Sequence, residues 1–209
     1  MTSVTVLAEE GPVTIGFDDL VRYHGHAALA MLAVTFRAQE AVFRGLLPDT
    51  PPARAAISVT SGHPGPGVRD SFEMITRCVT RGAYTVDRSL PGPRLNPRAD
   101  VVYAFDVSVA GVGSRHLAVR EGVLPEEFFD LVSITKNEAQ LARFREIKRE
   151  IAADVLARPD PDDLFVVSSR LPVFVPVTRR SGPRRPGPSR ARRRRGCRRD
   201  RPAAIRPPR

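Results

Sequence analysis

Three of the four histidines of this 209-residue chain lie in two glycine-containing segments, and their spacing is the strongest chemical signal in the sequence. His24 and His26 flank a glycine in the first segment, residues 23–30. His63 lies in the second segment, residues 61–67, which contains three glycines and two prolines. Neutral imidazole binds zinc, nickel, iron or copper. We therefore predict that the two segments face each other and hold a divalent metal ion, zinc in the first place, or a small polar ligand.

The spacing of His24 and His26 sets a condition on that site. On a regular helix, side chains two positions apart point about 200° away from each other and cannot bind one ion. Gly25 breaks the helix between them, which permits the two rings to converge without requiring it. The alternative is that His26 caps the following helix while His24 packs or faces solvent. If a bound metal ion kept one coordination position open, that position would hold a water of lowered pKa, and the protein would be a small metal-assisted enzyme.

The other chemical candidates give weaker signals. His116 lies in a predicted strand and is expected at the surface or on a sheet face. Residues 62–67 are a poor phosphate cradle, since their two prolines lack the N–H groups such loops need, and a rigid turn before a helix is favoured. Cys78 falls within an apolar helical stripe and is expected to be a buried core thiol. No nucleophile motif or paired-carboxylate motif is found.

The elements that must position these histidines can be placed from the sequence. A helix is expected to begin near Phe17 and to end at His24, where glycine can adopt the left-handed conformation. A second helix, rich in alanine and buried on most sides, is expected from His26 to about residue 44. Alternation over residues 54–60 predicts a strand before the second segment, and a helix capped by Asp70 or Ser71 should follow it.

The remaining pattern predicts a sheet and two further helices. Alternating apolar residues indicate strands at 83–90, 100–110 and 114–121, the last two joined by a hairpin, and a final strand at 164–167. A short helix is expected after Pro125, and a charged amphipathic helix at 135–157. We therefore expect an α+β fold in which a mixed, mostly antiparallel sheet packs against long helices. The single domain would span residues 17–168, after a lead-in at 1–16 that contains a short edge strand.

Charge separates the end of the chain from the rest. Residues 179–209 contain fourteen arginines and one acidic residue, whereas the preceding 178 residues have nineteen basic and twenty-two acidic side chains. Residues 169–209 are therefore predicted to be a linker and a disordered tail. The tail is either a basic arm that binds nucleic acid or another polyanion, or the out-of-frame translation of a GC-rich gene. Nucleic acid would be bound through this tail alone.

Several classes of protein are disfavoured. No run of about 18 uncharged apolar residues exists, so no membrane partner is expected. The first ten residues lack the basic start of a secretory signal, and Cys78 and Cys197 lie far apart in dissimilar contexts. The protein is therefore expected to be cytoplasmic and free of a structural disulfide.

The order of these features resembles the FmdE-like family, which takes its name from one component of formylmethanofuran dehydrogenase. The residues that carry the resemblance are Phe17-Asp18-Asp19, His24-Gly25-His26, Phe36-Arg37-Ala38, Glu138-Ala139 and Leu164-Phe165. The resemblance covers roughly residues 17–168, and His-Gly-His is its only specific motif. It implies an α+β fold and a metal site formed by the two glycine-containing segments.

This chain departs from the family pattern at two positions. Where the family has a cysteine after His-Gly-His, this chain has Ala28, and the family's Gly-Cys becomes Gly62-His63. The implied ligands are therefore His24, His26 and His63, completed by a carboxylate or water. The resemblance also implies an accessory role, because carbon dioxide reduction belongs to other components of that enzyme. A homodimer is a further expectation.

Overall fold

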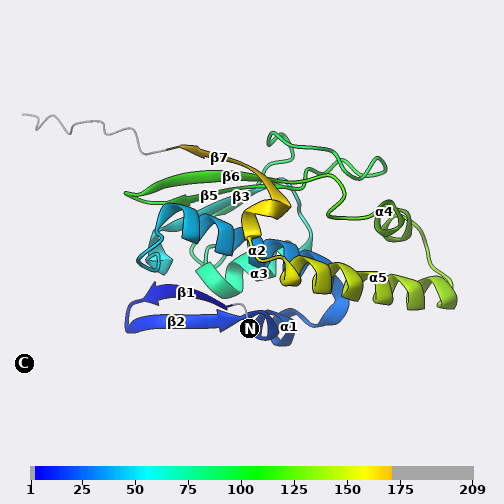
Figure 1. Cartoon of the computed structure of the whole chain (residues 1–209), viewed down its shortest axis with the longest axis horizontal. Coiled ribbons are helices and arrows are strands. Elements are labelled where there is room, and N and C mark those ends of the chain that lie inside the picture. Colours follow the sequence, from blue (N-terminus) through cyan, green and yellow to red (C-terminus); the bar gives the residue numbers. More distant parts are fainter. Residues whose placement is uncertain (1–2, 171–209) are drawn as a thin grey trace, which may run out of the picture. The chain divides into compact units, whose positions relative to one another are not determined.

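The structure, a computed structural model, describes residues 3–170, which belong to a single unit of the chain. The predicted tail lies outside the described residues, except for residues 169 and 170. The α+β class is confirmed. Figure 1 shows the helices α2 and α3 lying between the larger sheet on one side and a hairpin with helix α1 on the other.

The five-stranded sheet is mixed and mostly antiparallel, as predicted. Its strand order is β4-β3-β5-β6-β7, and only the pair β3–β4 is parallel. Successive side chains of β5 point to opposite faces of the sheet, and Phe105, Val107 and Val109 lie in the main apolar core. The strands are β3 (Ile57–Ser61), β4 (Tyr84–Val86), β5 (Ala104–Val109), β6 (Gly113–Val119) and β7 (Phe165–Arg170).

The central helix α2 carries most of the core. Thirteen of its eighteen residues are buried, which confirms the expectation from its alanine-rich sequence. Even Arg37 is only 1% exposed, and its guanidinium bonds to Glu40 and to the carbonyl of Arg158. The helices are α1 (Phe17–His24), α2 (Leu29–Leu46), α3 (Pro66–Thr76), α4 (Glu126–Val132) and α5 (Glu138–Ala157).

Residues 3–16 are more ordered than the expected lead-in with an edge strand. They form an antiparallel hairpin of β1 (Ser3–Ala8) and β2 (Gly11–Gly16) that is a two-stranded sheet of its own. Val4, Val6 and Ile15 from this hairpin are buried in the main core. The hairpin thus covers the face of α2 and α3 that the larger sheet leaves open.

Several boundaries differ from the sequence expectation, and three of the differences affect the site and the sheet. The helix after the second glycine-containing segment begins at Pro66 rather than at Asp70 or Ser71, because proline fits the first helical turn, where no N–H is needed. The second helix begins with a separate 3-10 turn, His26–Ala28. The strand expected at 83–90 is limited to β4, because residues 87–103 leave the sheet as a loop.

Candidate functional site

The two glycine-containing segments meet, as predicted from the sequence. A Cβ placed on Gly67 would lie 2.4 Å from the Cβ of Ala28, so the start of α3 packs too closely against the 3-10 turn for any side chain at position 67. The Nδ1 atom of His24 lies 2.8 Å from Oδ2 of Asp70, which links the end of α1 to α3. These contacts fix the two segments against each other.

A cavity of about 180 Å³ opens where the segments meet. The 3-10 turn and α2 form one wall, the start of α3 forms another, and side chains from α4 and α5 complete it. Most of the lining is apolar, and His63 and Lys148 supply its nitrogen-bearing side chains. Residues that line it include Ala28, Met31, His63, Tyr103, Phe128, Val132, Phe144 and Lys148.

His63 is held as a neutral hydrogen-bond donor. The backbone N–H of Gly65 donates to Nδ1 of His63 over 2.9 Å, so the proton of the neutral ring must be on Nε2. Burial, and then the nearby charge of Arg88, lower the pKa of His63 to about 4. The ring also packs against Tyr103, with 4.9 Å between the ring centroids. At neutral pH, His63 therefore offers one N–H donor in an apolar setting.

Lys148 carries the positive charge at the edge of the cavity. Its Nζ atom donates to the carbonyl of Ala27 over 2.7 Å and lies 4.5 Å from the centroid of the Phe144 ring. Only 9% of the residue is exposed. Burial, followed by the charges of nearby basic residues, lowers the pKa of Lys148.

The sequence did not draw attention to Lys148, although a signal was present. Lys148 lies four positions after Phe144 and three before Ile151, and both of these residues belong to the apolar stripe of α5. Residues at these spacings share one helix face. A lysine inside an apolar stripe therefore indicated a buried cation.

The three predicted metal ligands lie in three different surroundings. His24 bonds to Asp70, His63 lines the cavity, and His26 lines a neighbouring hollow together with basic residues of α5. Within residues 3–170, no group of three His, Cys, Asp or Glu side chains is arranged to hold a metal ion. That His24, His26 and His63 share one ion therefore stays a prediction.

The remaining candidate residues have structural roles. His116 pairs with Asp106 over 2.6 Å across β5 and β6, on the sheet face, as expected. Gly62 allows the chain to pass close to Val102, whose carbonyl oxygen would lie 2.6 Å from an added Cβ. Cys78 is fully buried just after α3, which confirms a core thiol.

Comparison with protein families and with curated protein sequences finds no match for this chain. The resemblance to the FmdE-like family therefore rests on the motif residues alone. None of the helices formed by residues 3–170 combines the length and apolar character needed to cross a bilayer.

Proposed function

We propose that this protein binds a small ligand in the cavity between its two glycine-containing segments. The observation that carries the proposal is the cavity itself, of about 180 Å³ and lined by both segments. A cavity of about 150 Å³ with apolar walls can hold a benzene ring. The cavity thus has room for a compact organic molecule or group.

The lining defines the chemistry of that ligand. Phe128, Phe144 and Met31 favour an apolar body, which they would remove from water. The Nε2–H group of His63 can donate to a ligand, because Nδ1 of the same ring already accepts from Gly65 and His63 lines the cavity. We therefore expect a ligand with an apolar ring or short chain and at least one acceptor oxygen. In this proposal the chain is a ligand-binding protein, and resemblance to the FmdE-like family implies that its role is accessory rather than catalytic.

Thermal unfolding with a small aromatic probe tests the proposal. Toluene should raise the melting temperature, since a ligand at 100 times its Kd stabilises the folded state by about 2.7 kcal/mol. Val132→Trp should abolish the effect, because Val132 lines the cavity and is 42% exposed, so a larger side chain there can be accommodated at the rim.

Ile134→Trp is the matched control for this experiment. Ile134 is exposed to the same degree, 43%, and is not among the residues that line the cavity. The control should therefore keep the stabilisation by toluene. An equal response of both tryptophan variants would show that toluene binds elsewhere, and the proposal would then be wrong.

Metal binding by His24, His26 and His63 is the second candidate, and one observation favours it. A carboxylate bonded to one ring nitrogen commonly orients a histidine whose other nitrogen binds a metal, and Asp70 stands in that relation to His24. Metal analysis of the purified protein, alongside His24→Ala and His63→Ala, tests this candidate. One zinc ion per chain that is lost in both variants would support a shared centre, and retention in either variant would reject it.

A further inference from the structure

A cluster of basic side chains lies directly beside the cavity. His26, Arg145, Lys148 and Arg149 line a second hollow of about 310 Å³ between the 3-10 turn and α5. The other lining residues are Ala27 and Leu29, so no carboxylate faces this hollow. We call these four side chains the cationic cluster.

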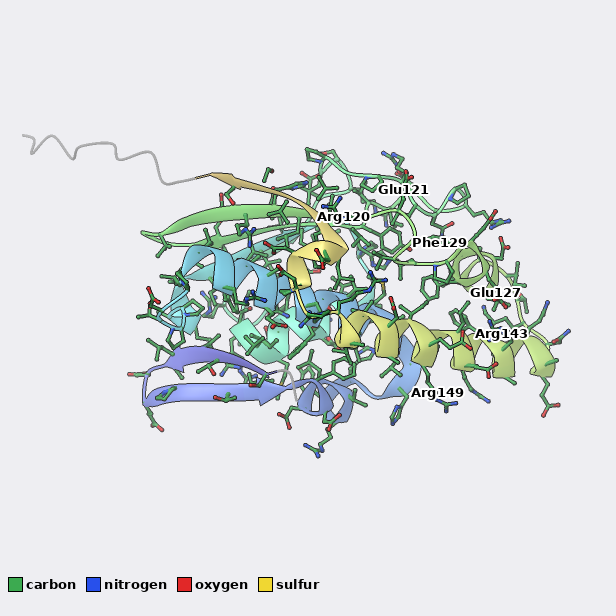
Figure 2. All side chains as sticks on the ribbon, in the orientation of Figure 1. Arg120, Glu121, Glu127, Phe129, Arg143 and Arg149 are labelled. Carbon is green, nitrogen blue, oxygen red and sulfur yellow. The ribbon has the colours of Figure 1, made fainter. Side chains whose placement is uncertain are left out.

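Helix geometry explains why the cluster forms. Arg145, Lys148 and Arg149 are three and four positions apart and therefore share one face of α5. That face packs against the segment between α1 and α2, which brings His26 to it. Figure 2 shows Arg149 projecting from α5 on the side where the chain passes from α1 to α2.

The positive charge of the cluster is not neutralised within the described part of the chain. Among residues 3–170, the ion pairs made by basic residues of α5 and its end are those of Arg143 and Arg158. Arg143, two positions before Arg145, meets three glutamates, whereas Arg145 and Arg149 meet none there. Like charges at these spacings destabilise a helix, so the arrangement has a cost that a bound anion would remove.

The cationic cluster and the cavity share two residues. Ala27 and Lys148 line both hollows, and Lys148 Nζ is fixed at the boundary by its bond to the carbonyl of Ala27. An ammonium has three N–H donors, so two remain after that bond. One molecule could therefore place an apolar part beside His63 and a charged part beside the arginines.

We propose that the cationic cluster binds the anionic group, a carboxylate or a phosphate, of an organic ligand whose apolar part occupies the cavity. This inference rests on the proposed function and adds the charge of the ligand to it. The guanidinium groups of Arg145 and Arg149 match the planar, two-oxygen geometry of such anions. His26 and Lys148 supply further donors around the same hollow.

Calorimetric titration of the full chain with matched probes tests the inference. The probes are toluene, phenyl phosphate, benzoate and inorganic phosphate. Phenyl phosphate or benzoate should bind at least tenfold more tightly than toluene, and phenyl phosphate should also bind more tightly than inorganic phosphate. The better of the two aromatic anions identifies the charged group that the cluster prefers.

Two charge-matched variants complete the test. Arg145→Gln/Arg149→Gln should lose the tenfold advantage of the aromatic anion while its toluene affinity stays unchanged. Arg94→Gln/Arg98→Gln removes the same charge from two exposed positions that line neither hollow, and it should behave as the wild type. It also controls for weak binding of phosphate to other basic residues of the chain.

The failure of this inference can be told apart from the failure of the proposed function. If toluene binds but the aromatic anions gain nothing, or if their advantage survives in Arg145→Gln/Arg149→Gln, the inference is wrong and the cavity proposal stands. If inorganic phosphate binds as tightly as phenyl phosphate, the anion site is separate from the cavity, and the inference is again wrong. If no aromatic probe binds in a manner that Val132→Trp abolishes, the proposed function itself fails.

Discussion

The Nδ1–H group of His24 donates to the carboxylate of Asp70 across 2.8 Å, and this contact ties the residue that ends α1 to the second turn of α3. The side chain of His24 is only 9% exposed. The contact thus fixes the end of α1 against α3.

A double-mutant cycle should measure this contact. We expect His24→Ala and Asp70→Ala each to lower the free energy of unfolding, with a coupling energy of about 0.5–1.5 kcal/mol between them. The pair His116 and Asp106 is the control, because it has the same chemistry with greater exposure of both side chains, 22% and 43%. Its coupling in urea unfolding should be smaller, since exposed pairs contribute less. A coupling near zero for His24 and Asp70 would contradict the structural role given to them.

The contact between Gly67 and Ala28 leads to a second prediction. Alanine normally stabilises a helix relative to glycine by about 0.5–1 kcal/mol, but Gly67→Ala should destabilise the protein by about 1–3 kcal/mol through overpacking. The new Cβ would lie 2.4 Å from that of Ala28. The double variant Ala28→Gly/Gly67→Ala should recover most of the loss in thermal unfolding. If Ala28→Gly gives no recovery, the two segments do not meet as described.

The buried ring of His63 predicts a pH dependence of stability. Its folded-state pKa is about 4, below the usual value of 6.5, chiefly because of burial. Between these values the unfolded chain binds the proton more readily, so His63 lowers stability as pH falls from about 6.5 to 4 and contributes no further change below that. The total contribution should be about 3 kcal/mol. His63→Gln should remove this slope in denaturant titrations at a series of pH values.

His116→Gln is the matched control for the pH series. It changes a histidine that is paired with a carboxylate on the sheet and leaves His63 in place, so the slope should persist. A His63→Gln variant with the wild-type slope would show that the ring is not buried in its neutral form.

The ion pairs between α4 and α5 predict that the melting temperature depends on salt concentration. Arg143 bonds to Glu127 of α4 and to Glu146 and Glu150 of α5, and these hydrogen bonds raise its pKa. Arg143→Gln should lower the melting temperature at low salt, and the difference from the wild type should shrink at about 1 M salt, because exposed charges are screened. Figure 2 shows Arg143 and Glu127 on facing helices.

Arg158→Gln is the control for that measurement. Among residues 3–170, the side chain of Arg158 has one carboxylate partner, Asp154, which lies one turn earlier in α5, so this side chain links no second element. Its replacement should have a smaller effect at every salt concentration. Equal effects of the two variants would show that Arg143 does not hold α4 against α5.

Local patterns in the sequence were enough to predict the fold class and most of the elements, because periodicity and helix-ending residues act over short stretches of chain. They predicted the helix ending at His24, the buried helix after it, the hairpin of β5 and β6 and the helix α5. They also indicated that the two glycine-containing segments belong to one site, since each interrupts a regular element beside a histidine.

What those segments do when they meet depends on the tertiary structure. Asp70 bonds to His24, Gly65 holds His63 as a donor, and His26 turns toward α5, so three histidines expected in one centre enter three environments. Lys148 and Arg149 line the hollow beside His26, although they follow it by more than one hundred residues in the chain. Contacts between residues so far apart in the sequence depend on how the helices pack, and the spacing of residues within one segment does not reveal that packing.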